Sequence, residues 1–260
     1  MKFENTLYEE SEGMATITIN RPKALNALNK EAVQEISARL DEAEEDETIK
    51  VIAITGAEDR SFCVGLDLKS VRGISAVEGM NLSLLGQKLT KKIEDLKKPV
   101  IAAINGYALG GGLELAMSCD LRVASENAKL GQPELNVGLI PGWGGTQRLP
   151  RLVGRGIAKE LIFTGKMIDA NAAKQLGLLN AVVPPDKLKS AVRELATELM
   201  TKPPVGIQLA KQLINSSVEI DLTKGLVQEA QAFGLLASTE DFNEGVAAFI
   251  EKRKPKYKGK

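Results

Sequence analysis

Three short strand-like runs place the strongest limit on how this chain can fold. Residues 51–55 (VIAIT) and 100–104 (VIAAI) are continuous apolar segments of strand length, typical of strands that are covered on both faces. Residues 121–125 (LRVAS) form a third strand-like run. Helical patterns lie between these runs, over 79–97 and after the glycines at 110–112. Strands that alternate with helices predict an α/β architecture.

The two ends of the chain differ from this central pattern. Residues 14–19 (MATITI) alternate and are rich in β-branched residues, which predicts a strand that pairs with the preceding TLYEE segment in a hairpin. A helical pattern begins after Asn29, its expected N-cap. After residue 155 the chain is mostly helical, and Pro203–Pro204 interrupt its last part, so we expect a core over 1–198 and a helical region over 199–260. The apolar stripe of the first helix consists of Ala32, Val33, Ile36, Leu40 and Ala43.

Histidine is absent from the chain, which removes several enzyme classes at once. A Ser–His–Asp triad, a Cys–His pair and nearly all zinc catalysis need imidazole. Acid–base chemistry must therefore come from Asp, Glu, Lys, Tyr or Cys. The two cysteines, Cys63 and Cys119, form no CxxC pair, which indicates a reducing compartment. We expect no metal site, and we do not expect Cys63 to act as a nucleophile, because no histidine activates it.

Charge and hydropathy give no sign of a membrane or secreted protein. Lys plus Arg and Asp plus Glu each total 34, so the formal net charge is zero. The longest uncharged run, over 99–113, has 15 residues, which is too short for a membrane helix. The N-terminal MKFENTLYEESEG has no apolar stretch typical of a signal peptide, so we expect a cytoplasmic protein. The last nine residues carry six positive charges and form either a solvated end or a contact for phosphate.

Two isolated carboxylates are the most informative residues. Glu114 is the only charged residue in an apolar, glycine-rich stretch of 21 residues, and Glu134 is the only one in a similar stretch of 17 residues. Burying a lone carboxylate is costly unless it is paired or hydrogen-bonded. If the fold brings the two together, their repulsion raises both pKa values and suits them to proton transfer near neutral pH. The alternative is that each caps a helix or pairs with Arg122 or Arg148.

Three glycine-containing segments have the composition to present backbone N–H groups to a ligand. Gly110–Gly112 precede a helical start, where N–H groups favour negative charge, or they serve close helix–strand packing. Gly65, in SFCVGLDLK, breaks the chain before a helical segment and exposes the N–H of Leu66, while Lys69 also fits a surface position. The run GLIPGWGGTQRL predicts a loop that ends with Thr146 as an N-cap.

Taken together, these segments resemble the enoyl-CoA hydratase (crotonase) family. The similarity runs through ITINRPKALNALN, SFCVGLDLK, KPVIAAINGYALGGGLELAMSCDLRVAS, GQPELNVGLIPGWGGTQRLPRLVG and FIEKRKP, which is nearly the whole chain. The resemblance implies an α/β fold of the crotonase type, a spiral of repeated ββα units with a helical C-terminal region for trimerisation. It also implies a homo-oligomer, usually a hexamer assembled as a dimer of trimers.

The resemblance implies roles for the isolated residues. The N–H groups of Leu66 and Gly111 match the family's oxyanion hole, which binds the thioester carbonyl oxygen as it becomes an enolate. Glu114 and Glu134 match the two glutamates that hold the attacking water in hydratases. Glu114 would take a proton from this water as it adds to the β-carbon, and Glu134 would supply a proton to the α-carbon. No cofactor is implied, because coenzyme A is part of the acyl-CoA substrate.

Further matches concern the acyl chain and coenzyme A. Leu66 stands where well-known hydratases have alanine, and Trp143 stands where smaller residues or phenylalanine are common. We expect both side chains to reduce the acyl pocket and to favour about four carbons. The positions that match coenzyme A contacts are Lys23, Ala24 and Leu25 in the RPKALNAL loop, Lys69 near the phosphates, and Phe249 and Lys252 toward the adenine, often of a neighbouring subunit.

The resemblance leaves three functions to compare. Reversible hydration of short-chain trans-2-enoyl-CoA to 3-hydroxyacyl-CoA is favoured, because other members of the family commonly lack one or both glutamates. An enoyl-CoA isomerase, or a hydratase of branched or cyclic acyl-CoA, is the first alternative. An RNA-binding homologue is the second. Such homologues use a basic helix face, whereas the helix over 31–49 is strongly acidic here, so we expect no nucleic-acid partner.

Overall fold

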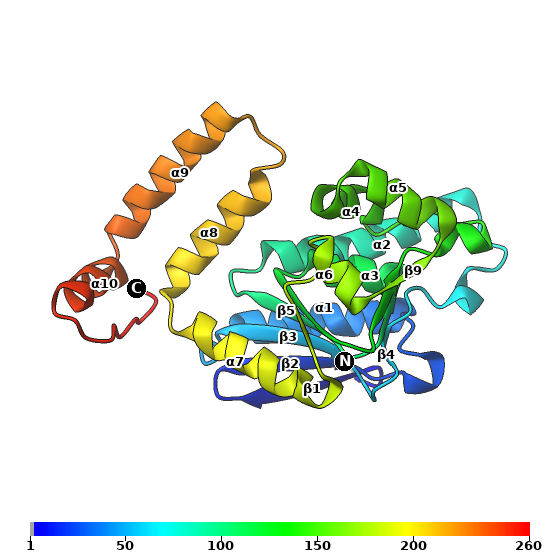
Figure 1. Cartoon of the computed structure of the whole chain (residues 1–260), viewed down its shortest axis with the longest axis horizontal. Helices are drawn as coiled ribbons and strands as arrows, with labels where there is room; N and C mark the ends of the chain where they lie inside the picture. Colours follow the sequence, from blue (N-terminus) through cyan, green and yellow to red (C-terminus); the bar gives the residue numbers. More distant parts are fainter. Residues whose placement is uncertain (1–2) are drawn as a thin grey trace.

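Two sheets form the centre of the molecule (Figure 1). The computed structural model describes residues 3–260. In spatial order, the larger sheet contains β1 (Thr6–Ser11), β2 (Met14–Ile19), β3 (Val51–Gly56), β5 (Val100–Ile104), β7 (Leu121–Ser125) and β10 (Ala181–Val183). The smaller sheet contains β4 (Ser61–Cys63), β6 (Tyr107–Leu109), β8 (Lys129–Gly131) and β9 (Met167–Asp169). Neighbouring strands are parallel, except that β1 is antiparallel to β2 and β8 to β9.

Helices follow the strands along the chain. The α-helices are α1 (Lys30–Glu45), α2 (Ala76–Asp95), α3 (Gly111–Ser118), α4 (Gly145–Val153), α5 (Arg155–Thr164), α6 (Ala170–Gln175), α7 (Leu188–Met200), α8 (Pro204–Ser216), α9 (Leu222–Ala237) and α10 (Glu240–Ile250). Short 3₁₀ helices are η1 (Pro22–Ala24), η2 (Leu68–Val71), η3 (Glu134–Val137) and η4 (Pro185–Lys187). No helix within residues 3–260 has both the length and the apolar character that crossing a lipid bilayer requires.

A unit of two strands and a helix is repeated along the chain. The order is β3–β4–α2, then β5–β6–α3, then β7–β8–α4, and in each unit the first strand joins the larger sheet and the second joins the smaller sheet. Because β3, β5 and β7 are neighbours, as are β4, β6 and β8, the chain advances by one strand in both sheets with every unit. The result is a spiral that returns each loop after a short strand to the same end of the molecule.

The larger sheet is covered on both faces, which explains why its central strands are continuously apolar. On one face, α7 packs Leu188 and Val192 against a cluster that includes Ile101 of β5. On the other face, the apolar stripe of α1, with Ile36 and Leu40 fully buried, belongs to the main core. The predictions for 51–55, 100–104 and 121–125 are therefore confirmed as strands.

Local capping decides where the helices begin. Asn29 caps α1 as predicted, since its side chain accepts a hydrogen bond of 3.0 Å from Ala32 N. The second helix begins three residues earlier than the pattern over 79–97 indicates, because Ser75 and Glu78 form a reciprocal capping box. The prediction of Thr146 as an N-cap is wrong: α4 begins at Gly145, and Gly144 occupies the N-cap with φ of +113°.

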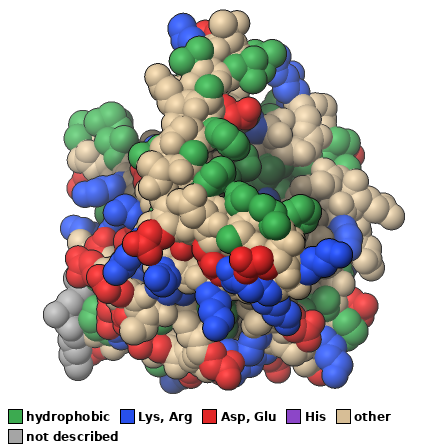
Figure 2. Space-filling view, turned by 90° about the vertical axis from the view of Figure 1, so that its left-hand side faces the viewer, with side chains coloured by type: hydrophobic (Ala, Val, Ile, Leu, Met, Phe, Trp, Pro, Cys, Tyr) green, Lys and Arg blue, Asp and Glu red, His purple; other side chains and the backbone are tan. Residues whose placement is uncertain are grey.

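The C-terminal helices stand apart from the two sheets (Figure 1). α8, which is described in full, buries Lys211 alone, and no residue of α9 is buried. Figure 2 shows apolar side chains gathered mainly in the upper half of the face that carries these helices, around a hollow, while charged side chains crowd its lower half. Exposed apolar residues of α8 to α10 and their connections are Ile214, Val218, Leu222, Leu226, Val227, Phe233, Leu235, Val246, Phe249 and Ile250.

Candidate active site

A cavity of about 340 Å³ brings together most of the expected catalytic groups. It is lined by Leu66 after β4, Gly111 at the start of α3, Glu114 in α3, Glu134 in η3 and Trp143 before α4. An apolar cavity with a few convergent polar groups suits an organic substrate whose reacting atoms must be oriented. The other large apolar residues of its wall are Val64, Leu68, Val71, Ile74, Leu82, Val137, Leu139 and Ile140.

Two backbone N–H groups meet at one side of this cavity. Gly65 has φ of +90°, and a β-carbon at this position would lie 2.7 Å from Gly111 N, so only glycine lets the two segments approach. The loop is held in place because Leu28 N donates to Gly65 O at 2.7 Å and Asp67 N donates to Leu28 O at 2.9 Å. Among the residues that the structure describes, no acceptor binds Leu66 N or Gly111 N. Both donors are thus open to an oxygen of a ligand.

Glu114 is buried on α3 and is held by backbone donors. Its carboxylate is part of a side chain that is 2% exposed, and Oε1 accepts hydrogen bonds from Trp143 N at 2.8 Å and Gly145 N at 2.6 Å. Burial raises the pKa of Glu114, while the two N–H groups and the charge of Arg148 act in the opposite direction. The group is therefore a carboxylate of increased basicity with one oxygen fixed by the protein.

Glu134 lies across the start of α3 from Glu114. A β-carbon at Gly110 would lie 3.3 Å from Glu134 Oε1, which places this carboxylate beside the glycine that precedes Gly111. Burial, with a smaller contribution from the charge of Glu114, raises the pKa of Glu134 to about 7. The fully buried Gln132 orients the carboxylate: its side-chain nitrogen donates to Oε1 at 2.7 Å and to Oε2 at 3.1 Å, since the reverse orientation of the amide would set oxygen against oxygen.

The alternative that each glutamate pairs with an arginine is wrong. Arg148 forms its ion pair with Glu94 of α2, with Nε 2.6 Å from Oε1. Arg122 donates instead to the backbone oxygens of Leu178 and Cys119, at 2.8 and 2.7 Å. Both carboxylates of the cavity are therefore available for proton transfer.

Trp143 closes the cavity beside the oxyanion donors. The residue is 4% exposed, and a β-carbon at Gly111 would lie 3.0 Å from its ring. Its ring also packs on Gly86 of α2 so closely that a β-carbon there would overlap the indole. Trp143 and Leu66 thus both line the cavity, where the sequence predicted them to limit the acyl chain.

The six positions that match coenzyme A contacts fall into two groups, neither of which lines the cavity. Lys23 and Ala24 lie in η1 and Leu25 follows as its C-cap, close to the oxyanion loop through the Leu28–Leu66 bridge. Exposed Lys69 lies in η2, the 3₁₀ helix whose Leu68 and Val71 line the cavity. By contrast, the structure does not bring α10 to the cavity of its own chain. Phe249, which is 87% exposed, and Lys252 lie at the end of that helix.

Sequence reasoning missed three contributors to the site. Gln132 is fully buried and stands two residues before Glu134 in the GQPE motif. A polar amide next to an isolated glutamate in an apolar stretch was the sequence signal that could have indicated it. Gly86, in the interior of α2, is explained only by the indole of Trp143. Glu94 of α2 holds Arg148 of α4, and no local sequence pattern indicates that these two helices are in contact. Within residues 3–260, no cluster of three or more metal-ligating side chains occurs.

Comparisons with known proteins agree with this geometry. The family model described as enoyl-CoA hydratase/isomerase matches residues 9–260. The short-chain-enoyl-CoA hydratase of Clostridium acetobutylicum is 46% identical over 98% of this chain and 97% of that protein, and the crotonyl-CoA hydratase of Syntrophomonas wolfei is 46% identical over 99% of both. The crystal structure of enoyl-CoA hydratase from Bacillus anthracis superimposes with a TM-score of 0.94, at 40% identity over 99% of this chain and 100% of that chain. The expected α/β spiral of the crotonase type is confirmed, and the chain belongs to the enoyl-CoA hydratase/isomerase family.

Proposed function

We propose that the protein hydrates short-chain trans-2-enoyl-CoA reversibly to 3-hydroxyacyl-CoA, with crotonyl-CoA and 3-hydroxybutyryl-CoA as the reference pair. The observation that carries this proposal is that two glutamates with raised pKa values line one apolar cavity together with two open N–H donors. The names of the two relatives at 46% identity, a short-chain-enoyl-CoA hydratase and a crotonyl-CoA hydratase, support the same reaction.

The mechanism assigns one task to each group. The N–H groups of Leu66 and Gly111 bind the thioester carbonyl oxygen, on which negative charge develops. Glu114 removes a proton from water as the water oxygen bonds to the β-carbon, and the electrons of the double bond move toward the carbonyl. Glu134, in its protonated form, then delivers a proton to the α-carbon. A proton passes back from Glu114 to Glu134 to complete the cycle, and dehydration follows the same path in reverse.

The acyl chain is proposed to be short because two large side chains stand in the cavity wall. Leu66 and Trp143 occupy space beside the oxyanion donors, where a longer acyl chain would need to pass. A methylene that fails to fit a pocket typically costs about 1–3 kcal/mol in the transition state. We therefore propose a preference for crotonyl-CoA over trans-2-decenoyl-CoA.

Coenzyme A recognition and assembly are proposed from the resemblance and from the exposed surfaces. Exposed Lys23 and Lys69, near the oxyanion loop, would meet the phosphates as point charges. The apolar residues exposed on α8 to α10 would be covered in a homo-oligomer, proposed as a dimer of trimers formed by the region 199–260 on cores over 1–198. Phe249 and Lys252 would then reach the adenine bound by a neighbouring subunit. We propose a cytoplasmic location.

The experiment that tests the function is a direct assay. Purified protein is mixed with crotonyl-CoA, and the loss of the conjugated enoyl absorbance is followed together with the formation of 3-hydroxybutyryl-CoA. Turnover in the ordinary range of about 1–10³ s⁻¹ is expected. If crotonyl-CoA is stable while a trans-3-enoyl-CoA is isomerised, the protein is an isomerase of the family and the proposal is wrong.

A further inference from the structure

The two N–H groups that hold Glu114 belong to a loop that needs an external support. Trp143 and Gly145 both donate to Glu114 Oε1, and Gly144 between them has φ of +113°. Such a glycine-rich turn has no side-chain packing of its own at positions 144 and 145. The carbonyl of Trp143 lies in the peptide unit between these two donors, so a group that binds this carbonyl helps to set the direction of both N–H groups.

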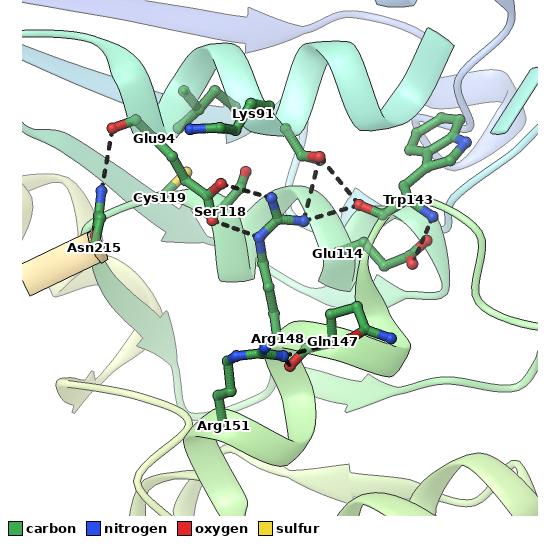
Figure 3. A network of polar contacts seen from close by, with 12 residues as sticks. Lys91, Glu94, Glu114, Ser118, Cys119, Trp143, Gln147, Arg148, Arg151 and Asn215 are labelled. Atoms are coloured by element: carbon green, nitrogen blue, oxygen red, sulfur yellow. Dashed lines mark hydrogen bonds and ion pairs between the residues drawn. The ribbon is translucent and has the colours of Figure 1, made fainter. Parts of the chain in front are cut away.

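Arg148 binds the carbonyl of this middle peptide unit (Figure 3). From the first turns of α4, its Nη1 donates to Trp143 O at 2.9 Å, and Thr90 Oγ1 of α2 donates to the same oxygen at 3.0 Å. A β-carbon at Gly144 would overlap the guanidinium, so the glycine makes room for this approach. The carbonyl of Trp143 is thus fixed from two helices, on the opposite side of the loop from Glu114.

Glu94 fixes the arginine in turn. Its two carboxylate oxygens accept from Arg148 Nε at 2.6 Å and Nη2 at 2.8 Å, a bidentate pair in which the side chains are 26% and 17% exposed. This fork leaves Nη1 for the Trp143 carbonyl and sets its direction. Arg151, on the same helix, extends elsewhere and donates to Gln147 (Figure 3).

We propose that Arg148, oriented by Glu94, is a positioning residue for the reaction: it fixes the Trp143 carbonyl and thereby keeps two backbone N–H donors on Glu114. The inference rests on the proposed function, because it assumes that Glu114 is the base. It adds a task for an ion pair that touches neither substrate nor reacting atoms. Loss of the support lets the loop rotate, and a displacement of about 1 Å at a catalytic group is enough for a loss on the order of 10²-fold.

The charges around Glu114 give the ion pair a signature that a plain structural brace lacks. The positive charge of Arg148 favours the ionised form of Glu114. Removing the arginine should therefore raise the pKa of Glu114. The elements packed against α3 are α2, α4, β6 and β4, and Glu134 of η3 lines the same cavity. Their other ionisable groups are Glu78, Lys88, Lys91, Lys92, Glu94 and Asp95 on α2, Arg148 and Arg151 on α4, Tyr107 on β6 and Cys63 on β4. Of these, the thiol of Cys63 has a pKa raised to about 12 by burial and stays neutral.

Trp143 supplies a readout that needs no substrate. It is the only tryptophan of the chain, and its backbone N–H donates to Glu114. Its emission should therefore change when Glu114 is protonated. The midpoint of this pH titration is compared in Arg148→Met, Glu94→Gln and the matched control Arg151→Met, and Glu114→Gln verifies the source of the signal. Melting temperatures and circular dichroism are recorded for every variant.

A shift in one direction is the expected result for the arginine. Arg148→Met should move the emission midpoint and the acid limb of kcat/KM to higher pH and lower kcat on the order of 10-fold to 100-fold. Glu94→Gln, which loosens the arginine without removing it, should lower kcat by a smaller factor, and Arg151→Met should match the wild type. If Arg148→Met does not fold, the proposal is tested with Glu94→Gln and with Thr90→Val, which removes a hydrogen bond to Trp143 O without changing any charge. Thr90→Val should lower kcat without moving the midpoint. An unchanged midpoint or wild-type kcat in Arg148→Met, or wild-type kcat in Glu94→Gln, overturns the proposal. Absence of hydratase activity in the wild type would instead contradict only the function proposed above.

Discussion

Gly86 of α2 is in direct contact with the indole of Trp143 in the loop before α4, and a β-carbon on this glycine would overlap the ring. The same ring lies against Gly111, where a β-carbon would be 3.0 Å from the indole. The helix interior, the aromatic ring and one oxyanion donor are therefore packed in series. A change at Gly86 must reach the site through the ring.

Gly86→Ala tests this relationship. In an ordinary helix interior the change stabilises by about 0.5–1 kcal/mol, but here we expect overpacking to destabilise the fold by about 1–3 kcal/mol. The displaced indole should also alter the emission of Trp143 and lower activity with crotonyl-CoA. Denaturant unfolding and steady-state kinetics measure both effects. Gly156→Ala is the control, because no atom lies within 4 Å of a β-carbon at that position. The stability of this variant should not fall below that of the wild type.

Glu114→Gln and Glu134→Gln test the assignment of the two acid–base groups. Each change keeps the shape and removes proton transfer, so kcat should fall by a factor on the order of 10²–10⁴. KM should change little, since neither carboxylate is needed to hold coenzyme A. The exposed Glu126, which does not line the cavity, provides the control Glu126→Gln with unchanged kinetics. Near-normal activity of either cavity variant would show that its glutamate does not transfer a proton.

Sequence patterns predicted those parts of the fold that depend on local order. The apolar strands, the cap at Asn29 and the isolation of Glu114 and Glu134 are all visible along the chain, and the structure brings the two glutamates to one cavity. Strands β4, β6, β8, β9 and β10 were not predicted, because a strand of three residues carries too few side chains to show a period.

The supports of the site were hidden for a different reason. Arg148 was considered as a direct partner of a glutamate, yet it acts on the opposite side of the loop and pairs with Glu94, 54 residues earlier in the chain. Gly86 has a meaning only against Trp143, and Gln132 only against Glu134. Each of these contacts joins elements whose proximity is set by the spiral, so no local pattern contains it.

The pH dependence of the reaction follows from the pair of carboxylates. Hydration starts with Glu114 ionised and Glu134 protonated, and dehydration starts with the same single proton on Glu114 instead. The pKa of Glu134 is raised to about 7, so loss of this proton above that pH leaves the pair without an acid. We expect kcat/KM to fall about tenfold per pH unit above the limb, in both directions. A pH–rate profile with crotonyl-CoA and with 3-hydroxybutyryl-CoA measures the limb, and a flat alkaline side would contradict the raised pKa.

The junction between the core and the C-terminal helices depends on one buried ion pair. Lys211 of α8 is 8% exposed, and its Nζ lies 2.8 Å from Asp120 Oδ2 and donates to the backbone oxygens of Ile93 and Lys98. Burial raises the pKa of Asp120, and the charge of Lys211 acts against this rise. The carboxylate of Asp120, whose side chain is 20% exposed, thus relies on the lysine and on Val100 N, which donates to Oδ2 at 2.7 Å, to stay ionised.

Lys211→Met should destabilise the protein strongly, because it removes one partner and leaves Asp120 buried without its counter-charge. Breaking a buried pair in this way costs about 3–5 kcal/mol. The matched control is Lys224→Met in the exposed pair with Asp221, where the side chains are 78% and 54% exposed and little loss of stability is expected. Denaturant unfolding measures both. Adding Asp120→Asn to Lys211→Met should recover part of the loss, since the amide needs no counter-charge. If the two lysine variants unfold at the same denaturant concentration, the pair does not hold α8 to the core.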